Sequence, residues 1–366
     1  MEILSLTTEN FRLLAAQTVE FSPEVNVISG ANAQGKTTLL EAAYLLTGLR
    51  SFRSRYDREL ISFGGQEALV DGQVQAAGRL QRIELRLSRG RTRLIRQNGV
   101  RRSSSEVTES LKAVLFSPED LGLVRGPASG RRKLLDSAIS QLRPGYGALL
   151  ADYARLYENK LRILRDWREK PSLLDPLEEF SRSLCLYSAR LIRYRASFAA
   201  RLAALAGPIH REFSGGGEKL EIRYETVSTV TDPTASEKAI LEEILQRQEA
   251  LSRAELESGQ CLVGAHKDDL AITVDGADAR TFASQGQTRT AALSLKLAER
   301  ELFLEETGEA PVLLLDDVLS ELDPFRQEFV LNRIGGGQTL ITCCDEATVS
   351  RLTGGRVLRM EKGRVV

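Results

Sequence analysis

The segment Val25–Thr37 reads VNVISGANAQGKT, and it decides the fold. Its apolar start, VNVIS, predicts a buried strand, and the following KTTLLEAAYLL predicts a helix over residues 35–46. Between them, Gly30–Thr37 fits the pattern GxxxxGK[ST]. The glycines let successive backbone N–H groups turn toward an anion, and the helix start adds its positive end. Strand, loop and helix in this order predict a phosphate-binding loop in an α/β sheet.

Each residue type in this loop has a chemical reason to be there. Lys36 is expected to reach the β- and γ-phosphates of ATP, and the Thr37 hydroxyl is expected to bind Mg²⁺. A Gly-rich turn with a surface lysine is the alternative, and the flanking strand and helix disfavour it. The residues predicted to bind ATP are Gly30, Ala31, Asn32, Ala33, Gln34, Gly35, Lys36, Thr37 and Thr38.

A second apolar run, PVLLLDDVLSELD over Pro311–Asp323, ends in carboxylates. Its first half is typical of a central parallel strand covered on both faces. Asp316 is predicted to hold Mg²⁺, and Asp317 to polarise the attacking water. Two adjacent, partly buried acids repel each other without a cation, so the alternative, an acid-rich loop, is less favoured beside a phosphate loop. The predicted catalytic residues are therefore Lys36, Asp316 and Asp317.

The segment FASQGQTRTAALSLKLAERELF begins at Phe282 and resembles the signature of ABC-type ATPases, S-x-G-Q, followed by its helix. The matching residues are Ser284, Gln285, Gly286 and Gln287. An ordinary helix cap is the alternative, since serine favours that position. The ABC resemblance implies that this turn caps the γ-phosphate bound by another protomer in a head-to-tail dimer, and that Ser320 and Asp323 belong to the D-loop.

This chain departs from most ABC ATPases at two positions. Asp317 stands where they have Glu, and TLITCCDEA carries no switch histidine. A shorter acid and a missing histidine predict slow ATP hydrolysis, as in a timed clamp. His210, at the end of a helical stretch, is expected to be structural.

Periodicity divides the 366 residues into an α/β part and an insertion. Residues 66–102 alternate polar and apolar side chains, and Asn98-Gly99 predicts a tight hairpin turn. From about residue 131 long helical patterns follow. The expected fold class is an α/β ATPase head of SMC/ABC type, with a mixed sheet around the phosphate loop and an inserted, mainly helical second lobe. The expected bounds are 1–115 plus 262–366 for the ATPase lobe and 116–261 for the insertion.

Composition sets broader limits on the protein. Net charge is zero, with 50 basic and 50 acidic residues. The four cysteines form no CxxC pair, which disfavours zinc, and Cys343 and Cys344 are expected in a buried strand. There is neither a signal-like start nor an apolar run of about 18 residues. These features predict a cytoplasmic protein.

Two further segments carry a closer resemblance. SPEDLGLVRGPASGRRKLLD (117–136) and GAHKDDL (264–270) resemble signatures of the RecF family of bacterial recombination mediators, with Ala128 and Ala265 where that family has proline. LRSFRS (49–54) matches as well. The resemblance implies an ATP-dependent homodimer that binds duplex DNA at gaps, acts with RecR and RecO to load RecA on SSB-coated strands, and is a weak DNA-stimulated ATPase. His266 is a hallmark of that family whose role the sequence leaves open.

The sequence gives its own indication of DNA binding. Residues 50–102 hold 13 Arg and five acids, a charge of +8 (13 − 5). Arg89, Arg91, Arg93 and Arg96 crowd one predicted hairpin, and Arg91 and Arg93 are expected on one side of a strand. Like charges this close favour a polyanionic partner, although a solvated strand face is an equal alternative.

Two other functions compete with the repair clamp. One is an ATP-binding DNA scaffold without significant turnover, which Asp317 leaves open. The other is an ABC-type ATPase subunit of another complex, such as a membrane transporter. Lys36 and Ser284 are 248 positions apart (284 − 36), which is long for a compact transporter subunit and short for SMC coiled coils.

Overall fold

A computed structural model describes residues 1–344 and 355–366. The chain forms two compact units. The first unit comprises Met1–Gly122, Glu212–Gly216 and Arg289–Val366, and the second comprises Leu123–Arg211 and Gly217–Thr288. Among the described residues, no helix combines the length and the apolar character that crossing a bilayer requires.

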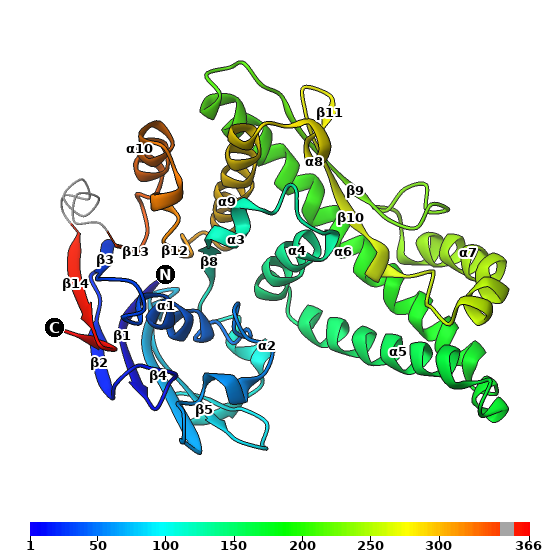
Figure 1. The fold of residues 1–366 in the computed structure, drawn as a ribbon, viewed down its shortest axis with the longest axis horizontal. Helices are drawn as coiled ribbons and strands as arrows, with labels where there is room; N and C mark the ends of the chain where they lie inside the picture. Colours follow the sequence, from blue (N-terminus) through cyan, green and yellow to red (C-terminus); the bar gives the residue numbers. More distant parts are fainter. Residues whose placement is uncertain (345–354) are drawn as a thin grey trace. The chain divides into compact units, whose positions relative to one another are not determined.

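The phosphate-loop sheet of the first unit has six strands in the order β15-β14-β3-β13-β12-β8 (Figure 1). Neighbouring strands are parallel except for the β14–β15 pair. Their bounds are Val25–Ser29 (β3), Ala113–Phe116 (β8), Val312–Asp316 (β12), Thr339–Cys343 (β13), Arg356–Glu361 (β14) and Arg364–Val365 (β15). Every residue of β12 and β13 is buried, as expected of parallel strands covered on both faces.

An antiparallel sheet of six strands, in the order β2-β1-β4-β5-β6-β7, completes the first unit. Its strands are Glu2–Glu9 (β1), Gln17–Glu20 (β2), Glu67–Ala76 (β4), Arg79–Ser88 (β5), Leu94–Gln97 (β6) and Val100–Arg102 (β7). Burial alternates along β4, as the period-two pattern predicts. Asn98 and Gly99 both have positive φ, of 49° and 82°, which confirms the predicted hairpin turn between β6 and β7.

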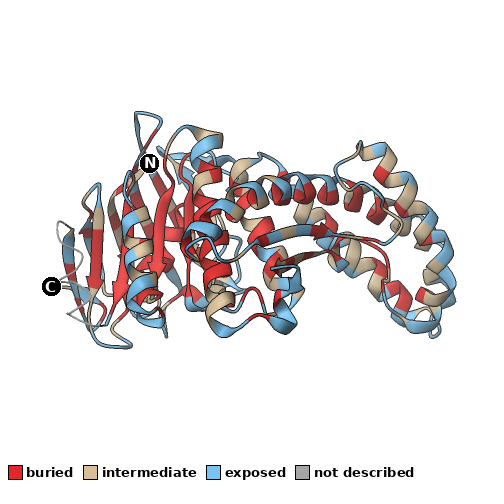
Figure 2. Cartoon of the chain, turned by 90° about the horizontal axis from the view of Figure 1, so that it is seen from above, coloured by how far each residue is buried: buried red, intermediate tan, exposed pale blue. Residues whose placement is uncertain are grey.

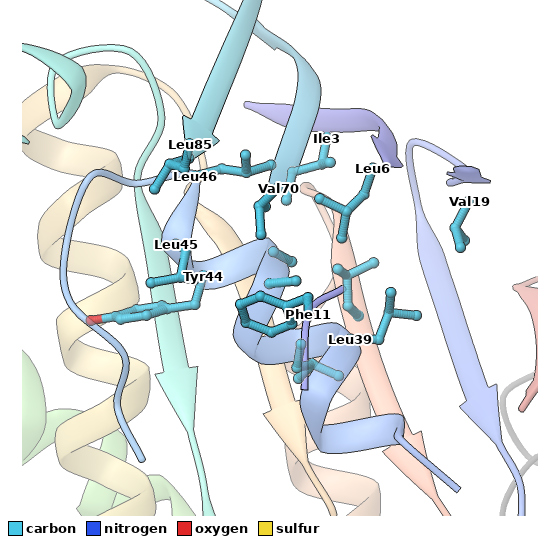
Figure 3. Packing of buried hydrophobic residues seen from close by; sticks show 14 of the residues in the cluster. Ile3, Leu6, Phe11, Val19, Leu39, Tyr44, Leu45, Leu46, Val70 and Leu85 are labelled. Atoms are coloured by element: carbon cyan, nitrogen blue, oxygen red, sulfur yellow. The ribbon is translucent and has the colours of Figure 1, made fainter. Parts of the chain in front are cut away.

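Helix α1 (Lys36–Leu45) contacts strands of both sheets, and its buried side chains belong to the hydrophobic core of the first unit. Nine of its ten residues are buried. Figure 3 shows Leu39, Tyr44 and Leu45 of this helix packed with Phe11 and Val70 from the antiparallel part. Each fully buried side chain of this size contributes about 1.5–3 kcal/mol. This packing fixes the helix, and with it the loop that precedes its first residue.

Shorter helices and one long helix complete the first unit. They are η1 (Asp57–Leu60), α2 (Ser104–Val107), α3 (Pro118–Leu121), η4 (Leu319–Glu321), α10 (Pro324–Arg333) and α9 (Gln285–Thr307), whose first residues belong to the second unit.

The second unit is mainly helical, with one small sheet. Its helices are α4 (Ala128–Leu142), α5 (Tyr146–Asp166), η2 (Pro171–Leu174), α6 (Leu177–Phe213), α7 (Glu237–Ser258), η3 (Ala265–Lys267) and α8 (Ala279–Phe282). The antiparallel strands are β9 (Leu220–Glu225), β10 (Asp269–Val274) and β11 (Ala277–Asp278), in the order β11-β10-β9. Buried and exposed residues alternate along its long helices (Figure 2), as the helical periodicity predicts.

These units confirm the expected fold class, but their bounds differ from the predicted ones. The second unit begins at Leu123 instead of residue 116, and residues 262–288 belong to it instead of to the ATPase lobe. The physical reason is strand pairing, because Asp269–Val274 pairs along its whole length with Leu220–Glu225. The predicted strand for Cys343 and Cys344 also ends one residue early, so that Cys343 is buried and Cys344 is exposed.

Candidate functional site

The phosphate loop has the backbone shape that its glycines predict. Gly30 and Gly35 have φ of 152° and 105°, and a Cβ at Gly30 would lie 2.5 Å from the Met360 carbonyl oxygen. The Lys36 ammonium donates to the carbonyl oxygens of Gly30 at 2.6 Å and Ala31 at 2.9 Å. The carbonyl oxygens of the loop thus hold the ammonium group of its own lysine.

Asp316 and Thr37 meet at the carboxyl end of the phosphate-loop sheet. The Thr37 hydroxyl donates to Asp316 Oδ1 at 2.7 Å, and the Thr342 hydroxyl donates to the same oxygen at 3.0 Å. Burial raises the pKa of Asp316 above its ordinary value, although both hydroxyl hydrogen bonds act in the opposite direction. The structure therefore brings together the two residues that the sequence assigned to Mg²⁺.

The donor set fits Mg²⁺ held jointly with a nucleotide. One hydroxyl and one carboxylate are available from Thr37 and Asp316, and Mg²⁺ favours one or two carboxylates together with substrate phosphates. Within residues 1–344 and 355–366, no three His, Cys, Asp or Glu side chains are arranged to hold a metal by themselves. The residues present thus match a metal that arrives with ATP.

Asp317 is held apart from Asp316 by its backbone. Its φ is 53°, in the left-handed region, and its N–H donates to the Thr342 hydroxyl at 2.8 Å. Its carboxylate oxygens each lie 4.0 Å from Cys344 Sγ, and Cys344 Sγ lies 3.2 Å from the Lys36 ammonium. Asp317 and Lys36 therefore both lie close to the Cys344 thiol.

A cavity of about 450 Å³ adjoins the phosphate loop. It is lined by Ser29, Gly30, Ala31, Gln34, Cys344, Arg359, Met360, Glu361 and Lys362. Its far wall comes from the carboxyl end of β14, which is tied to the loop because the Gly363 N–H donates to the Gln34 carbonyl at 3.0 Å. A volume of this size is in the range of small-ligand sites.

The signature residues Ser284–Gln287 lie in the second unit, at the start of α9. Ser284 Oγ accepts from the Gln287 N–H at 3.1 Å, and Gln287 Oε1 accepts from the Ser284 N–H at 2.8 Å. This reciprocal cap confirms a helix start at Ser284. Ser284 and Gln285 are exposed, so this helix start is open to a ligand or to another molecule.

The second turn of α9 holds the D-loop segment within the first unit. Arg289 Nη1 donates to the Glu321 carbonyl oxygen at 2.6 Å. Arg326 donates to the Thr290 hydroxyl through Nε at 3.1 Å and Nη2 at 3.0 Å. Ser320 Oγ donates to the Asp317 carbonyl at 2.7 Å, and Asp323 caps α10. The D-loop is therefore linked both to the signature helix and to the predicted catalytic acid.

Several residues around the site were not singled out in the sequence. Thr342 bridges both acids, Cys344 touches Lys36, and Glu41 on α1 is fully buried and paired with Arg12 at 2.6 Å. A hydroxyl at the end of a buried strand next to β12 could have indicated Thr342. No local pattern indicates Arg12, because its pairing with Glu41 depends on folding of the chain between them.

The four arginines proposed for DNA differ in their surroundings. Arg93 forms an ion pair with Asp57, its side chain is only 8% exposed, and it donates to the Leu49 carbonyl at 2.9 Å. Arg96 lies 3.6 Å from Glu84, and Arg89 Nε donates to the Gly65 carbonyl at 2.8 Å. Arg91 is exposed, and both Arg91 and Arg93 precede β6, so the expected placement of the two on one strand face is wrong. Asp57 draws Arg93 inward instead.

The two signature-like segments around residues 131 and 268 meet inside the second unit. Arg131 forms two hydrogen bonds with Asp269, at 2.6 and 2.7 Å. Asp268 is fully buried and accepts from Arg195 at 3.0 Å, from Thr226 at 2.6 Å and from the Tyr224 hydroxyl. Removing one partner of such a buried pair costs about 3–5 kcal/mol. These segments therefore hold the second unit together.

His266, which is half-buried, forms a separate set of hydrogen bonds within the second unit. Its Nδ1 is 2.8 Å from the Tyr153 hydroxyl and its Nε2 is 3.0 Å from the Cys261 carbonyl. Burial lowers the pKa of His266 to about 4. His266 is thus a neutral bridge between α5 and the segment before η3.

Comparisons with known proteins agree with this geometry. A family model described as RecF/RecN/SMC N terminal domain matches residues 2–364. Proteins named "DNA replication and repair protein RecF" from Listeria welshimeri and Agathobacter rectalis are each 38% identical, over 100% of this chain and 99% of theirs.

Solved structures give the same result. Two described as the recombination mediator protein RecF in the RecFOR pathway, with ATPrS and with ATP, match with TM-scores of 0.92 and 0.89 at 36% identity, covering 100% of this chain and 97% and 96% of theirs. An Smc head domain from Pyrococcus furiosus shares the fold, with a TM-score of 0.54, 15% identity and coverage of 100% of this chain and 95% of that one. The phosphate loop, the Asp316 strand and the capped signature helix, together with these full-length matches, identify the chain as a member of the RecF family of SMC-type ATPases.

Proposed function

We propose that this protein is an ATP-dependent clamp on duplex DNA, in which two copies enclose two ATP molecules head to tail. In each half, the Lys36 loop of one copy binds the triphosphate, and the exposed Ser284 turn of the other copy caps the γ-phosphate. The observation that carries the proposal is the contact of Thr37 with Asp316 at 2.7 Å, together with an open, capped helix start at Ser284. In this arrangement each ATP is bound by the phosphate loop of one copy and by the helix start of the other.

The residues divide the work of hydrolysis. Lys36 leaves the carbonyl oxygens of Gly30 and Ala31 and binds the phosphates of ATP. Thr37 and Asp316 would hold Mg²⁺, which would supply positive charge to offset that of the triphosphate. Asp317 orients the attacking water. Its side chain is one methylene shorter than the Glu of most ABC ATPases, and no switch histidine assists it, so turnover is slow and the clamp persists.

The relatives suggest where the clamp works. The matching structures are described as parts of the RecFOR pathway, which supports RecR and RecO as partners of this chain. We propose that the clamp marks duplex DNA at single-strand gaps and helps those partners load RecA on SSB-coated strands. ATP binding would close the clamp and hydrolysis would release it.

Phosphate release by the full chain tests the proposal. We expect slow turnover that rises with added duplex DNA, and a loss of at least about 100-fold in Lys36→Met and Asp316→Asn. The first substitution removes the charge that binds the phosphates, and the second removes the carboxylate that would hold Mg²⁺. Arg253→Glu, an exposed change on α7, is the control and should retain the rate. Full turnover in Lys36→Met would contradict the assignment.

A scaffold that binds ATP without significant turnover is the second candidate, and Asp317 is the observation that favours it. If the protein is such a scaffold, the wild type should bind ATP and DNA but release phosphate no faster than the Asp316→Asn variant. The same assay distinguishes the two functions.

A further inference from the structure

A second cavity, of about 590 Å³, lies wholly within the second unit. It forms where α5 begins beside the middle of α6 and the first residue of α7. Its lining residues are Arg143, Pro144, Gly145, Tyr146, Leu149, Arg190, Arg193, Tyr194, Ser197 and Glu237. None of these residues takes part in the ATP site, so ATP binding does not account for this cavity.

The rim of this cavity is strongly basic. The lining includes three arginines, Arg143, Arg190 and Arg193, and one carboxylate, so that its formal charge is +2 (3 − 1). That carboxylate, Glu237, is already paired with Arg190 at 2.7 Å. Arg193 has neither an ion-pair nor a hydrogen-bond partner among the residues that the structure describes. Arg190 and Arg193 are three residues apart on α6 and therefore lie on the same face.

The start of α5 adds to the positive charge at the rim. The helix runs for 21 residues, and its cap residue, Gly145, has no side chain to bind the first N–H groups. The Tyr146 N–H donates to the Arg143 carbonyl at 3.1 Å, and Gly145 and Tyr146 line the same cavity as the arginines, so the positive end of the helix lies beside them. The rim favours a ligand with more than one negative charge.

The walls below the rim are apolar and fixed. Tyr146 and Tyr194 pack edge to face with ring centroids 5.4 Å apart, and Pro144 and Leu149 complete the wall. The Tyr146 hydroxyl donates to Asp136 at 2.6 Å, and Arg195 holds the same carboxylate through two hydrogen bonds of 2.8 Å. This buried network keeps the wall in place, so the cavity is formed before any ligand arrives.

We propose that this cavity, between the start of α5 and the Arg190–Ser197 stretch of α6, binds an acidic peptide segment of a partner protein, with an apolar side chain in the cavity and carboxylates on the arginine rim. Arginine pairs with carboxylates through two parallel hydrogen bonds, and arginine and tyrosine are enriched at the energetic centres of protein interfaces. The inference concerns a surface outside the ATP site and does not depend on the clamp mechanism.

Single-stranded nucleic acid fits this cavity less well. Sequence-independent binding of a strand needs a groove that follows the backbone and several exposed rings on which successive bases stack. Here Tyr194 is the one ring of the lining with large exposure, at 41%, whereas Tyr146 is buried, with 1% exposed. A bound inorganic anion would occupy only a small part of the volume.

Fluorescence anisotropy with the full chain tests the proposal. The probes are fluorescein-labelled octapeptides with four Asp or Glu and two Leu or Phe residues in three different orders. Matched probes replace the acids by Lys, or the apolar residues by Ser, and a labelled oligo-dT of similar mass represents a single strand. We expect at least one acidic, apolar peptide to bind, and both kinds of matched peptide to bind at least about tenfold more weakly.

Two variants locate the binding. Arg193→Glu and Tyr194→Ser change exposed side chains and should each weaken peptide binding at least about tenfold, while ATP binding stays the same. Arg253→Glu makes the same charge change on α7, away from the cavity, and should leave peptide affinity within about twofold. Absence of binding by every acidic peptide, equal binding of acidic and serine-substituted probes, or loss of oligo-dT binding alone in Arg193→Glu would each overturn the proposal.

Discussion

At the scale of single residues, His266 is held through both nitrogens of its ring. The sequence left open whether this histidine senses the nucleotide or braces the fold. Its two ring nitrogens are occupied by the Tyr153 hydroxyl and the Cys261 carbonyl, and both partners lie in the second unit. His266 and Tyr153 are 113 positions apart, and His266 and Cys261 are five positions apart. Only the folded chain could reveal the first of these contacts.

The lowered pKa of His266 predicts a pH dependence of stability. Burial lowers the pKa from 6.5 to about 4, so the unfolded chain takes up a proton before the folded one as the pH falls. The stabilisation is therefore present above pH 6.5 and is lost on the way to pH 4, by about 1 kcal/mol between pH 7.5 and pH 5.5.

Urea unfolding of the wild type and of His266→Gln at these two pH values measures the effect. Other titrating groups, such as Asp268, whose pKa burial raises to about 6, contribute to both proteins and cancel in the comparison. The variant should lose less stability on acidification than the wild type. Equal losses in the two proteins would show that His266 does not titrate in this way.

Cys344 gives a second prediction at this scale. Of the four cysteines it alone is exposed, and its sulfur lies 3.2 Å from the Lys36 ammonium. N-ethylmaleimide should therefore modify the native protein mainly at Cys344, and the adduct should block ATP binding because it occupies the space above the phosphate loop.

Mass spectrometry locates the adduct, and binding of a fluorescent ATP analogue reports the effect. ATP added first should slow the modification. Cys344→Ser should bind ATP with or without the reagent. If alkylated wild-type protein still binds ATP with unchanged affinity, the thiol lies outside the phosphate site.

At the scale of elements, the sequence predicts those helices, strands and turns that depend on residues close together along the chain. The strand, loop and helix around Lys36, the hairpin turn at Asn98-Gly99 and the buried strand before Asp316 all follow from local periodicity and backbone preference. The position of β10 does not, because the pattern of Asp269–Val274 identifies a strand without identifying its partner. For the same reason the predicted boundary at residue 262 differs from that of the folded units.

The basic hairpin permits a prediction about DNA. Arg93 is neutralised by Asp57, whereas Arg91 is exposed and adjacent to Arg89, so Arg89 and Arg91 are the better candidates for phosphate contacts. The double change Arg89→Glu, Arg91→Glu should weaken binding of duplex DNA and reduce the slope of log affinity against log salt by about two.

A salt titration of duplex binding in the presence of ATP measures that slope. Arg253→Glu serves as the control for a general change of charge. Arg93→Glu should instead lower stability, because it places two acids together where Arg93 and Asp57 now pair. A slope that stays unchanged in the double variant would place the DNA surface elsewhere.

At the scale of the whole molecule, the ATP site that we propose needs residues from two copies of the chain. The sequence singled out the Lys36 loop, the Asp316 strand and the Ser284 turn, but not Thr342 or Cys344, which contact them. The structure brings the first two into contact and leaves the third exposed at the start of α9. In the proposed head-to-tail arrangement, the Ser284 turn of a second chain would complete the site, and no local pattern specifies the surface at which two chains would meet.

Sedimentation velocity of the full chain with ATP, with ADP and with a non-hydrolysable ATP analogue tests this account most directly. ATP and its analogue should produce dimers and ADP should not. Ser284→Arg, which places a bulky side chain on the signature turn, should remain monomeric while still binding ATP, whereas Ser252→Arg on the exposed face of α7 should dimerise normally. Dimers of Ser284→Arg equal to those of the wild type, or monomers with ATP at every protein concentration, would contradict the head-to-tail site.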